Sequence, residues 1–186
     1  WQGGTGELTE KKSRFIATVA PVKSEEEAQS FIEQTKKKYW DARHNCTAFT
    51  IGSQHQLTRC SDDGEPAGTA GRPMLDVLLG ENIHDTAVVV TRYFGGTLLG
   101  TGGLVRAYSG AVREALKASV ILERQKGVRL EIGTDYNDLG KIQYLIGQNQ
   151  IPVLSSSYTD AVALELLVPQ NFLDSFVSSI TEGTAG

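Results

Sequence analysis

The stretch Thr86–Leu104, TAVVVTRYFGGTLLGTGGL, predicts a buried strand, a glycine-rich loop and the beginning of a helix. Residues 86–94 form a nearly continuous run of apolar and β-branched residues, which is typical of a strand at the centre of a sheet. The loop at 95–103 contains five glycines. Apolar residues then recur at helical spacing over about 16 residues, and they share one face: Leu104, Tyr108, Ala111, Val112, Ala115 and Leu116. We therefore expect this helix to pack on the sheet through that face.

The loop Gly95–Gly103 has the composition of an anion-binding site. Free amides and the dipole at a helix N-terminus attract anions, and glycines let a ligand approach the backbone closely. Arg92 precedes the loop and Arg106 follows it, so both can donate charge-assisted hydrogen bonds to a phosphate. The glycine spacing matches neither a Walker loop nor the dinucleotide-binding fingerprint. Two interpretations stay open: the loop binds an anion, or its glycines only let the helix pack against the sheet.

A second loop, Ser61–Pro73, carries three carboxylates in four residues, at Asp62, Asp63 and Glu65. These side chains can hold a hard cation such as Mg²⁺, although the spacing is not that of an EF-hand. They can equally accept hydrogen bonds from the backbone of a tight turn. Because both loops join a strand end to a helix start, we expect the carboxylates to lie within about 10–12 Å of Arg92 or Arg106.

The two cysteines and three histidines offer few catalytic combinations. Cys46 and Cys60 are both predicted to be small buried side chains of a reduced protein. His44 lies two residues before Cys46, but no third group that would orient such a pair is visible, so a cysteine hydrolase is a minor alternative. His55 and His84 fall in predicted turns, where we expect them to be solvated.

The remaining pattern indicates two α+β domains with a boundary near residue 126. The first half adds a strand at 14–22, a helix from 24 to 39, a hairpin at 46–52 and 55–60, and a short helix at 73–79. The second half predicts strand, helix, strand, strand and helix, and one more strand would complete a split β-α-β fold. Its elements span 128–133, 136–148, 151–158, 161–168 and 170–181.

Charge and hydropathy restrict the classes of function. The net charge of the chain is −4. Its composition, with 40% hydrophobic and 22% charged residues, is ordinary for a globular protein. Residues 1–126 carry 16 basic and 15 acidic residues, a net of +1, whereas residues 127–186 carry two and seven, a net of −5. A nucleic-acid role must therefore rest on a local basic patch in the first half. With no run of roughly 20 apolar residues and no signal pattern, we expect a cytoplasmic protein without membrane partners.

Several residue strings together resemble the YigZ/IMPACT family: Lys12–Phe15, His44–Cys46, Ser61–Pro73 and Thr91–Tyr108. The likeness covers residues 12–118 closely, while the remainder resembles the variable C-terminal domain of bacterial members. The resemblance implies two two-layer α+β domains. The first, residues 1–126, would be similar to domain IV of elongation factor G, a four-stranded sheet with helices on one face. The second, residues 127–186, would be ferredoxin-like, with a sheet that is either three-stranded or truncated before its last strand.

Eukaryotic relatives of this family regulate translation by binding the activator of an amino-acid-starvation kinase, so the resemblance implies a cytosolic, translation-associated binding protein. We expect the first domain to bind RNA, the ribosome or a translation-factor partner, with no cofactor, catalytic set or metal site. The alternatives are a metal-assisted hydrolase of a phosphorylated or peptide substrate, and a protein-interaction module. The expected binding site comprises His44, Asp62, Asp63, Glu65, Arg72, Arg92, Tyr93, Gly95, Gly96, Gly102, Gly103 and Arg106.

Overall fold

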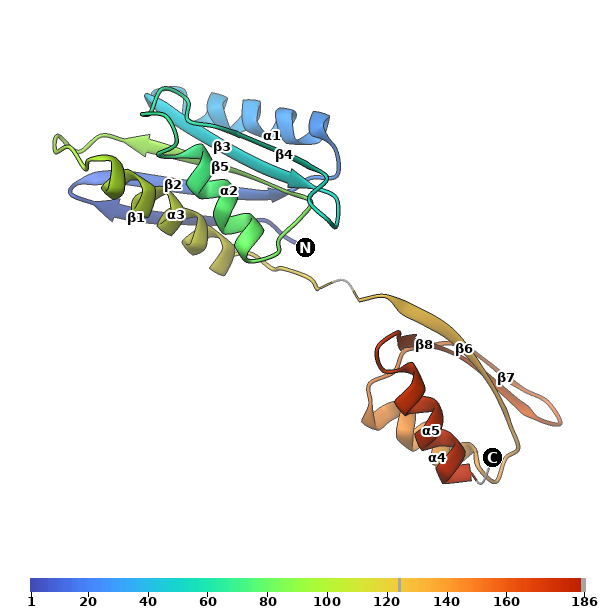
Figure 1. The fold of residues 1–186 in the computed structure, drawn as a ribbon. Helices are drawn as coiled ribbons and strands as arrows, with labels where there is room; N and C mark the ends of the chain where they lie inside the picture. Colours follow the sequence, from blue (N-terminus) through green and yellow to red (C-terminus); the bar gives the residue numbers. More distant parts are fainter. Residues whose placement is uncertain (124, 185–186) are drawn as a thin grey trace. The chain divides into compact units, whose positions relative to one another are not determined.

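The computed structural model describes residues 1–123 and 125–184, which form two compact units (Figure 1). Unit 1 comprises residues 1–122 and unit 2 residues 123–186, so the division falls four residues before the expected boundary at 126. Arg124, which belongs to the expected boundary segment, lies outside the described residues. Residues 185 and 186, at the chain end where we expect no final strand, lie outside them too. None of the described helices is long and apolar enough to cross a membrane.

Unit 1 is built on a five-stranded antiparallel sheet with the order β1-β2-β5-β3-β4. The predicted central position of the strand at 86–94 is confirmed, because β5 pairs with both β2 and β3 and its first seven residues are buried. The strands are β1 (Thr5–Glu10), β2 (Ser13–Pro21), β3 (His44–Ile51), β4 (Leu57–Ser61) and β5 (Thr86–Tyr93).

The expectation of a four-stranded sheet is wrong because β1 adds a fifth strand along β2. The two strands are joined by Lys11 and Lys12, which both adopt left-handed backbone conformations, with φ of 45° and 65°. A two-residue hairpin turn of this kind usually contains Asn-Gly or Asp-Gly. The sequence contains no such signal here, and for this reason its pattern does not reveal the hairpin.

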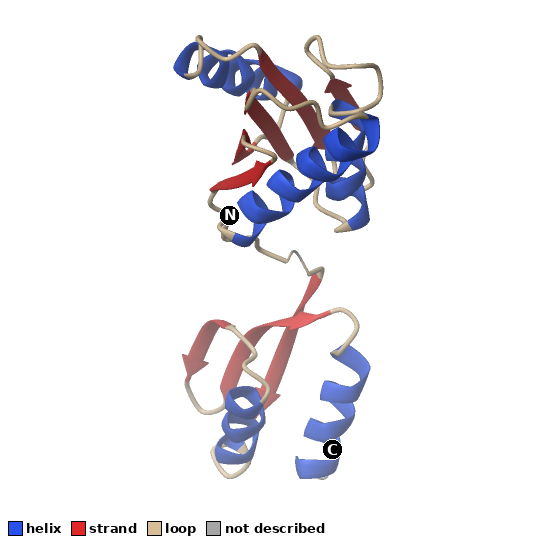
Figure 2. Cartoon of the chain, turned by 90° about the vertical axis from the view of Figure 1, so that its left-hand side faces the viewer, coloured by secondary structure: helices blue, strands red, loops and turns tan. Residues whose placement is uncertain are grey.

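The expectation of helices on one face is also wrong (Figures 1 and 2). Helices α2 (Gly71–Gly80) and α3 (Thr101–Lys117) cover one face, where Tyr108 and Met74 pack with Phe15, Val88 and Val90. Helix α1 (Glu25–Lys38) covers the other face, where its Ala28 joins Phe49 and Ala87. Successive strand residues point to opposite faces. Because β5 is buried at its first seven positions, both of its faces are covered.

Unit 2 has the predicted order of strand, helix, strand, strand and helix, and its strands pair in the order β6-β8-β7. Alternate residues of β8 face α4 and α5, which form one core with them around Phe176. Helix α4 begins later than predicted because the Asp135 carboxylate accepts hydrogen bonds from the backbone of residues 137 and 138 and holds a turn there. The elements are β6 (Gly127–Thr134), α4 (Leu139–Gln148), β7 (Val153–Tyr158), β8 (Val162–Pro169) and α5 (Leu173–Thr184).

The two cysteines occupy different environments. Cys46 is fully buried, as predicted, but the prediction of a buried Cys60 is wrong, because β4 is an edge strand and Cys60 is exposed on it. Burial raises the pKa of the Cys46 thiol to about 12. Thiolate is the reactive form of cysteine, so Cys46 is unreactive at neutral pH.

We expect iodoacetamide to alkylate the folded protein once, at Cys60, and a second time only after denaturation. Mass spectrometry of the intact protein and of its peptides measures this directly. Cys60→Ser is the matched control, since it should leave a folded protein without a reactive thiol. Rapid alkylation of Cys46 in that folded variant would contradict the burial described above.

Candidate functional site

Three strands of unit 1 bring their ends together at one end of the sheet. The register pairs Arg14 with Tyr93 and His44 with Arg92, so the starts of β2 and β3 lie beside the end of β5. The residues that follow β5 form the glycine loop, and α3 begins at Thr101. We call this end of unit 1 the strand-end region. It includes the connecting segments 11–12, 39–43, 62–70 and 94–100 and the start of α3.

A buried polar network lies beneath α3 in this region. Arg92 Nη1 donates to Glu65 Oε1 over 2.6 Å, and the Tyr108 hydroxyl donates to the same oxygen over 2.7 Å. The Cys46 thiol lies 3.3 Å from the Tyr108 hydroxyl. Burial raises the pKa of Tyr108, as does the adjacent Cys46, so the phenol stays protonated and donates. The predicted approach of the acidic loop to Arg92 is therefore confirmed for Glu65.

Arg92 is only 7% exposed, yet it keeps unused hydrogen-bonding capacity. Its Nε has no hydrogen-bond partner among the described residues. The guanidinium lies over two aromatic rings, 5.5 Å from the Phe15 centroid and 5.6 Å from that of Phe94. An arginine neutralised by a buried carboxylate and flanked by rings is fixed in position, so Arg92 organises its neighbours rather than offering a free charge to solvent.

Asp62 holds the shape of the acidic loop. Its carboxylate accepts hydrogen bonds from the backbone N–H groups of Gly68, Ala70 and Gly71, at 2.8, 3.0 and 2.8 Å. Partial burial opposes ionisation of Asp62, but these backbone donors outweigh it and lower its pKa. Asp62 therefore fastens the loop to the start of α2.

Asp63 fastens the other side of the loop. Its carboxylate accepts from Lys36 Nζ over 2.8 Å and from the backbone N–H of Asn45 over 2.7 Å. His44 Nδ1 donates to the Asp63 carbonyl over 2.9 Å. Partial burial by itself would raise the pKa of Asp63. The hydrogen bonds from the Lys36 ammonium and the Asn45 amide outweigh this effect, so the pKa of Asp63 is lowered.

The carboxylates of the acidic loop are thus engaged with the protein itself. No group of three or more His, Cys, Asp and Glu side chains within residues 1–123 and 125–184 has an arrangement that suits a metal ion. The hydrogen bonds of Asp62 and Asp63 match the interpretation in which these carboxylates accept hydrogen bonds from the backbone. The geometry lends no support to the metal-assisted hydrolase.

Other expected site residues do not join the network. Tyr93 follows Arg92 directly, so its side chain lies on the opposite face of the sheet, where its hydroxyl donates to Asp41 over 2.8 Å. Partial burial and the Asp41 hydrogen bond raise the pKa of Tyr93. Arg72 is exposed on α2 and pairs with Asp76 at 2.8 Å. The pleat of β5 therefore divides the expected site between two faces.

The glycine loop supports both of its open interpretations. A Cβ at Gly95 would overlap the backbone of Lys12, and one at Gly103 would lie 2.9 Å from Leu99 Cβ, so these two glycines permit close packing. Gly96 and Gly100 have φ of 84° and 71° and face open space. Their conformations, which favour glycine, leave the backbone of the loop accessible.

Sequence reasoning missed the exposed aromatic side chains of this region. Trp40, in the loop before β3, is 82% exposed, and Phe94, directly after β5, is 57% exposed. Arg106, Lys12 and Arg43 are exposed in the same region, and none has a carboxylate partner in the described part of the chain. The signal that could have revealed them is the presence of large aromatic residues in polar loops beside basic ones.

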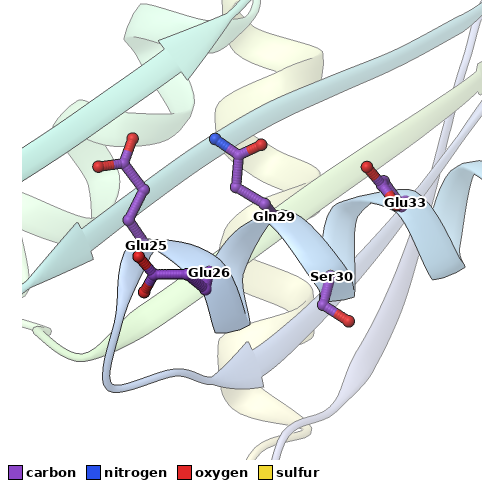
Figure 3. Close-up of a pocket in the computed structure, with 5 residues that line it drawn as sticks. All are labelled: Glu25, Glu26, Gln29, Ser30 and Glu33. Carbon is purple, nitrogen blue, oxygen red and sulfur yellow. The ribbon is translucent and has the colours of Figure 1, made fainter.

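The exposed side of α1 has the opposite character. A shallow groove there is lined by Glu25, Glu26, Gln29, Ser30 and Glu33 (Figure 3). All charged side chains that line it are glutamates, so this groove repels phosphate. The exposed cations Lys12, Arg43 and Arg106 of the strand-end region have no counterpart among the residues that line this groove.

We expect Asp62→Asn to lower the free energy of unfolding at pH 7 by about 1.5–3 kcal/mol, because an amide cannot replace a carboxylate as acceptor for three N–H groups. Since the pKa of Asp62 is lowered in the folded state, its contribution is complete above the unfolded-state pKa of about 4 and is lost as the pH falls through the folded-state pKa. The difference between parent and variant should therefore shrink in acid. Urea unfolding across a pH series measures this difference, with the exposed Asp76→Asn as control. A loss that persists unchanged below the folded-state pKa would contradict the assigned role.

Comparison with known proteins agrees with the resemblance of the sequence. The Impact N-terminal domain matches residues 11–116, and a domain of unknown function (DUF1949) matches residues 132–186. IMPACT family member YvyE of Bacillus subtilis is 42% identical over 185 residues, which cover 100% of this chain and 85% of that protein. IMPACT family member YigZ of Escherichia coli is 38% identical over 178 residues, covering 95% and 87%. A crystal structure of a hypothetical protein superposes with a TM-score of 0.64 at 37% identity, covering 100% of this chain and 91% of the other. The chain therefore belongs to the IMPACT family.

Proposed function

We propose that this protein is a translation-associated regulatory protein whose first unit binds RNA at the strand-end region. The observation that carries the proposal is a set of exposed cations at this end of the sheet, Lys12, Arg43 and Arg106, which have no carboxylate partner among the described residues. Two exposed rings, Trp40 and Phe94, stand in loops that leave the same end. Cations that neutralise phosphates and aromatic rings that stack on bases are the two components of single-strand binding surfaces.

The placement of Arg106 supports a phosphate contact near the start of α3. Its side chain lies along the first turn of the helix, since Nη1 would be 3.5 Å from a Cβ at Gly102. The guanidinium therefore adds a full positive charge where the helix already presents its positive end. Arg92, by contrast, is neutralised by Glu65 and contributes no free charge.

Membership in the IMPACT family supports the connection to translation, because regulation of translation is what the resemblance implies for eukaryotic relatives. The near-neutral balance of the first half, +1 over residues 1–126, requires that RNA affinity come from a few placed cations. Individual substitutions in the strand-end region should then have measurable effects.

We expect Arg106→Ala to weaken binding to purified bacterial ribosomal RNA and to reduce the slope of log affinity against log salt by about 1, because one phosphate contact is lost. Fluorescence anisotropy over a series of KCl concentrations measures both quantities. Arg113→Ala is the matched control, since Arg113 is exposed on the same helix two turns further on and is also unpaired within the described chain.

The two variants change the net charge equally, so a difference between them reports position rather than total charge. Equal effects of both substitutions would show that binding follows overall charge, and would overturn the assignment to this region. Absence of RNA binding by the parent at low salt would overturn the RNA proposal itself.

A further inference from the structure

We infer that Phe94 is a stacking platform for one unpaired base of a single-stranded RNA, with the phosphates beside that base held by Lys12 and Arg106. This inference rests on the proposed function and specifies its ligand as single-stranded rather than duplex RNA. It depends on three features of the structure: the ring is exposed, a buried network supports it, and exposed cations stand on the adjoining segments.

The Phe94 ring is exposed although it follows the most buried strand of the molecule. All residues from Thr86 to Arg92 are buried, whereas the Phe94 side chain is 57% exposed. Leaving this much aromatic surface in water has an unfavourable free energy, because burial of apolar surface contributes about 25 cal/mol per Å². A planar ligand that covers the ring recovers that free energy.

A chain of buried contacts holds the ring in place from beneath. The Arg92 guanidinium lies 5.6 Å from the Phe94 centroid and is itself bound by Glu65. Glu65 in turn accepts from Tyr108 on α3, so the support extends from the sheet to the helix. A ring fixed in this way loses little side-chain entropy when a base stacks on it. The buried network thus gains a role in binding without touching the ligand.

Exposed cations stand on the two chain segments that adjoin the loop after Phe94. Gly95 brings the chain after Phe94 into contact with the backbone of Lys12, and Gly95 N donates to Ser13 Oγ over 3.1 Å. On the other side of the loop, Arg106 lies over the first turn of α3. The open backbone at Gly96 and Gly100 between them lets a phosphate approach without meeting a side chain.

These features favour a single strand over a duplex. In double-stranded RNA the base faces are stacked on each other and are unavailable to a protein ring, whereas bases of single strands can be splayed out onto aromatic side chains. An exposed ring beside cations is complementary to both parts of a single strand, the base and the phosphate. A duplex offers only the phosphates to this surface.

Phe94→Leu tests the platform, because leucine keeps apolar volume and lacks the flat aromatic face. We expect this variant to bind oligouridine about 5- to 150-fold more weakly than the parent, the range that corresponds to loss of one stacked base. Its salt slope should be unchanged, because no charge is removed. Phe94→Trp should retain affinity, and Leu98→Ala, which removes an 81% exposed apolar side chain from the same loop, should bind as the parent does.

Two further ligands separate stacking from a general change of the surface. Inorganic polyphosphate has the charges without the bases, and an RNA duplex has bases that are already stacked, so Phe94→Leu should bind both as the parent does. The melting temperature of each variant shows whether it is folded. Equal losses for oligouridine and polyphosphate would overturn stacking in favour of a structural effect.

The outcomes distinguish this inference from the proposed function. If Phe94→Leu binds oligouridine with the affinity of the parent while Arg106→Ala does not, the platform is overturned and the RNA-binding region stands. If the parent binds neither oligouridine nor ribosomal RNA, both are overturned.

Discussion

The ion pair between Arg92 and Glu65 is the constraint on which the rest of unit 1 depends. Taking two charges out of water has a large free-energy cost, which is offset only when geometry and further hydrogen bonds are good. The structure meets this requirement with a 2.6 Å contact and a second donor, the Tyr108 hydroxyl, on the same oxygen. Because these three residues come from β5, the acidic loop and α3, the pair fastens a strand, a loop and a helix together.

The acidic loop and the glycine loop have different structural roles. In the acidic loop, the carboxylates of Asp62 and Asp63 accept hydrogen bonds from backbone amides and Lys36. Of the three carboxylates, Glu65 is the one that joins the buried network of Arg92 and Tyr108. In the glycine loop, Gly95 and Gly103 serve packing, while Gly96 and Gly100 leave the backbone open. The first loop is therefore a brace. The second combines packing with an accessible backbone, next to which we propose that the ligand binds.

The distribution of charge is compatible with the proposed binding of RNA by a protein whose net charge is −4. Two acidic residues near the strand-end region are paired with cations, Glu65 with Arg92 and Asp63 with Lys36, whereas Asp41 accepts a hydrogen bond from the neutral Tyr93 and keeps its charge. The cations Lys12, Arg43 and Arg106 have no such partners in the described chain. The local balance at this end is thus more positive than the sum over the sequence, and local charge determines where an anion binds.

The sequence by itself determined the elements whose signals are local, among them the central strand at 86–94, the amphipathic helix after the glycine loop and the order of elements in unit 2. Apolar periodicity reports burial, so these could be predicted from it. The hairpin at Lys11 and Lys12 could not, because its left-handed turn lacks the usual residues.

Only the tertiary structure decided that α1 covers the second face of the sheet, that Cys60 lies on an edge, and that Glu65 rather than Asp62 or Asp63 meets Arg92. It also separated Arg92 from Tyr93 and exposed Trp40 and Phe94. These outcomes depend on strand register, on the alternation of side chains across the sheet and on which neighbour fills each space, and such relations join residues that are far apart in the chain.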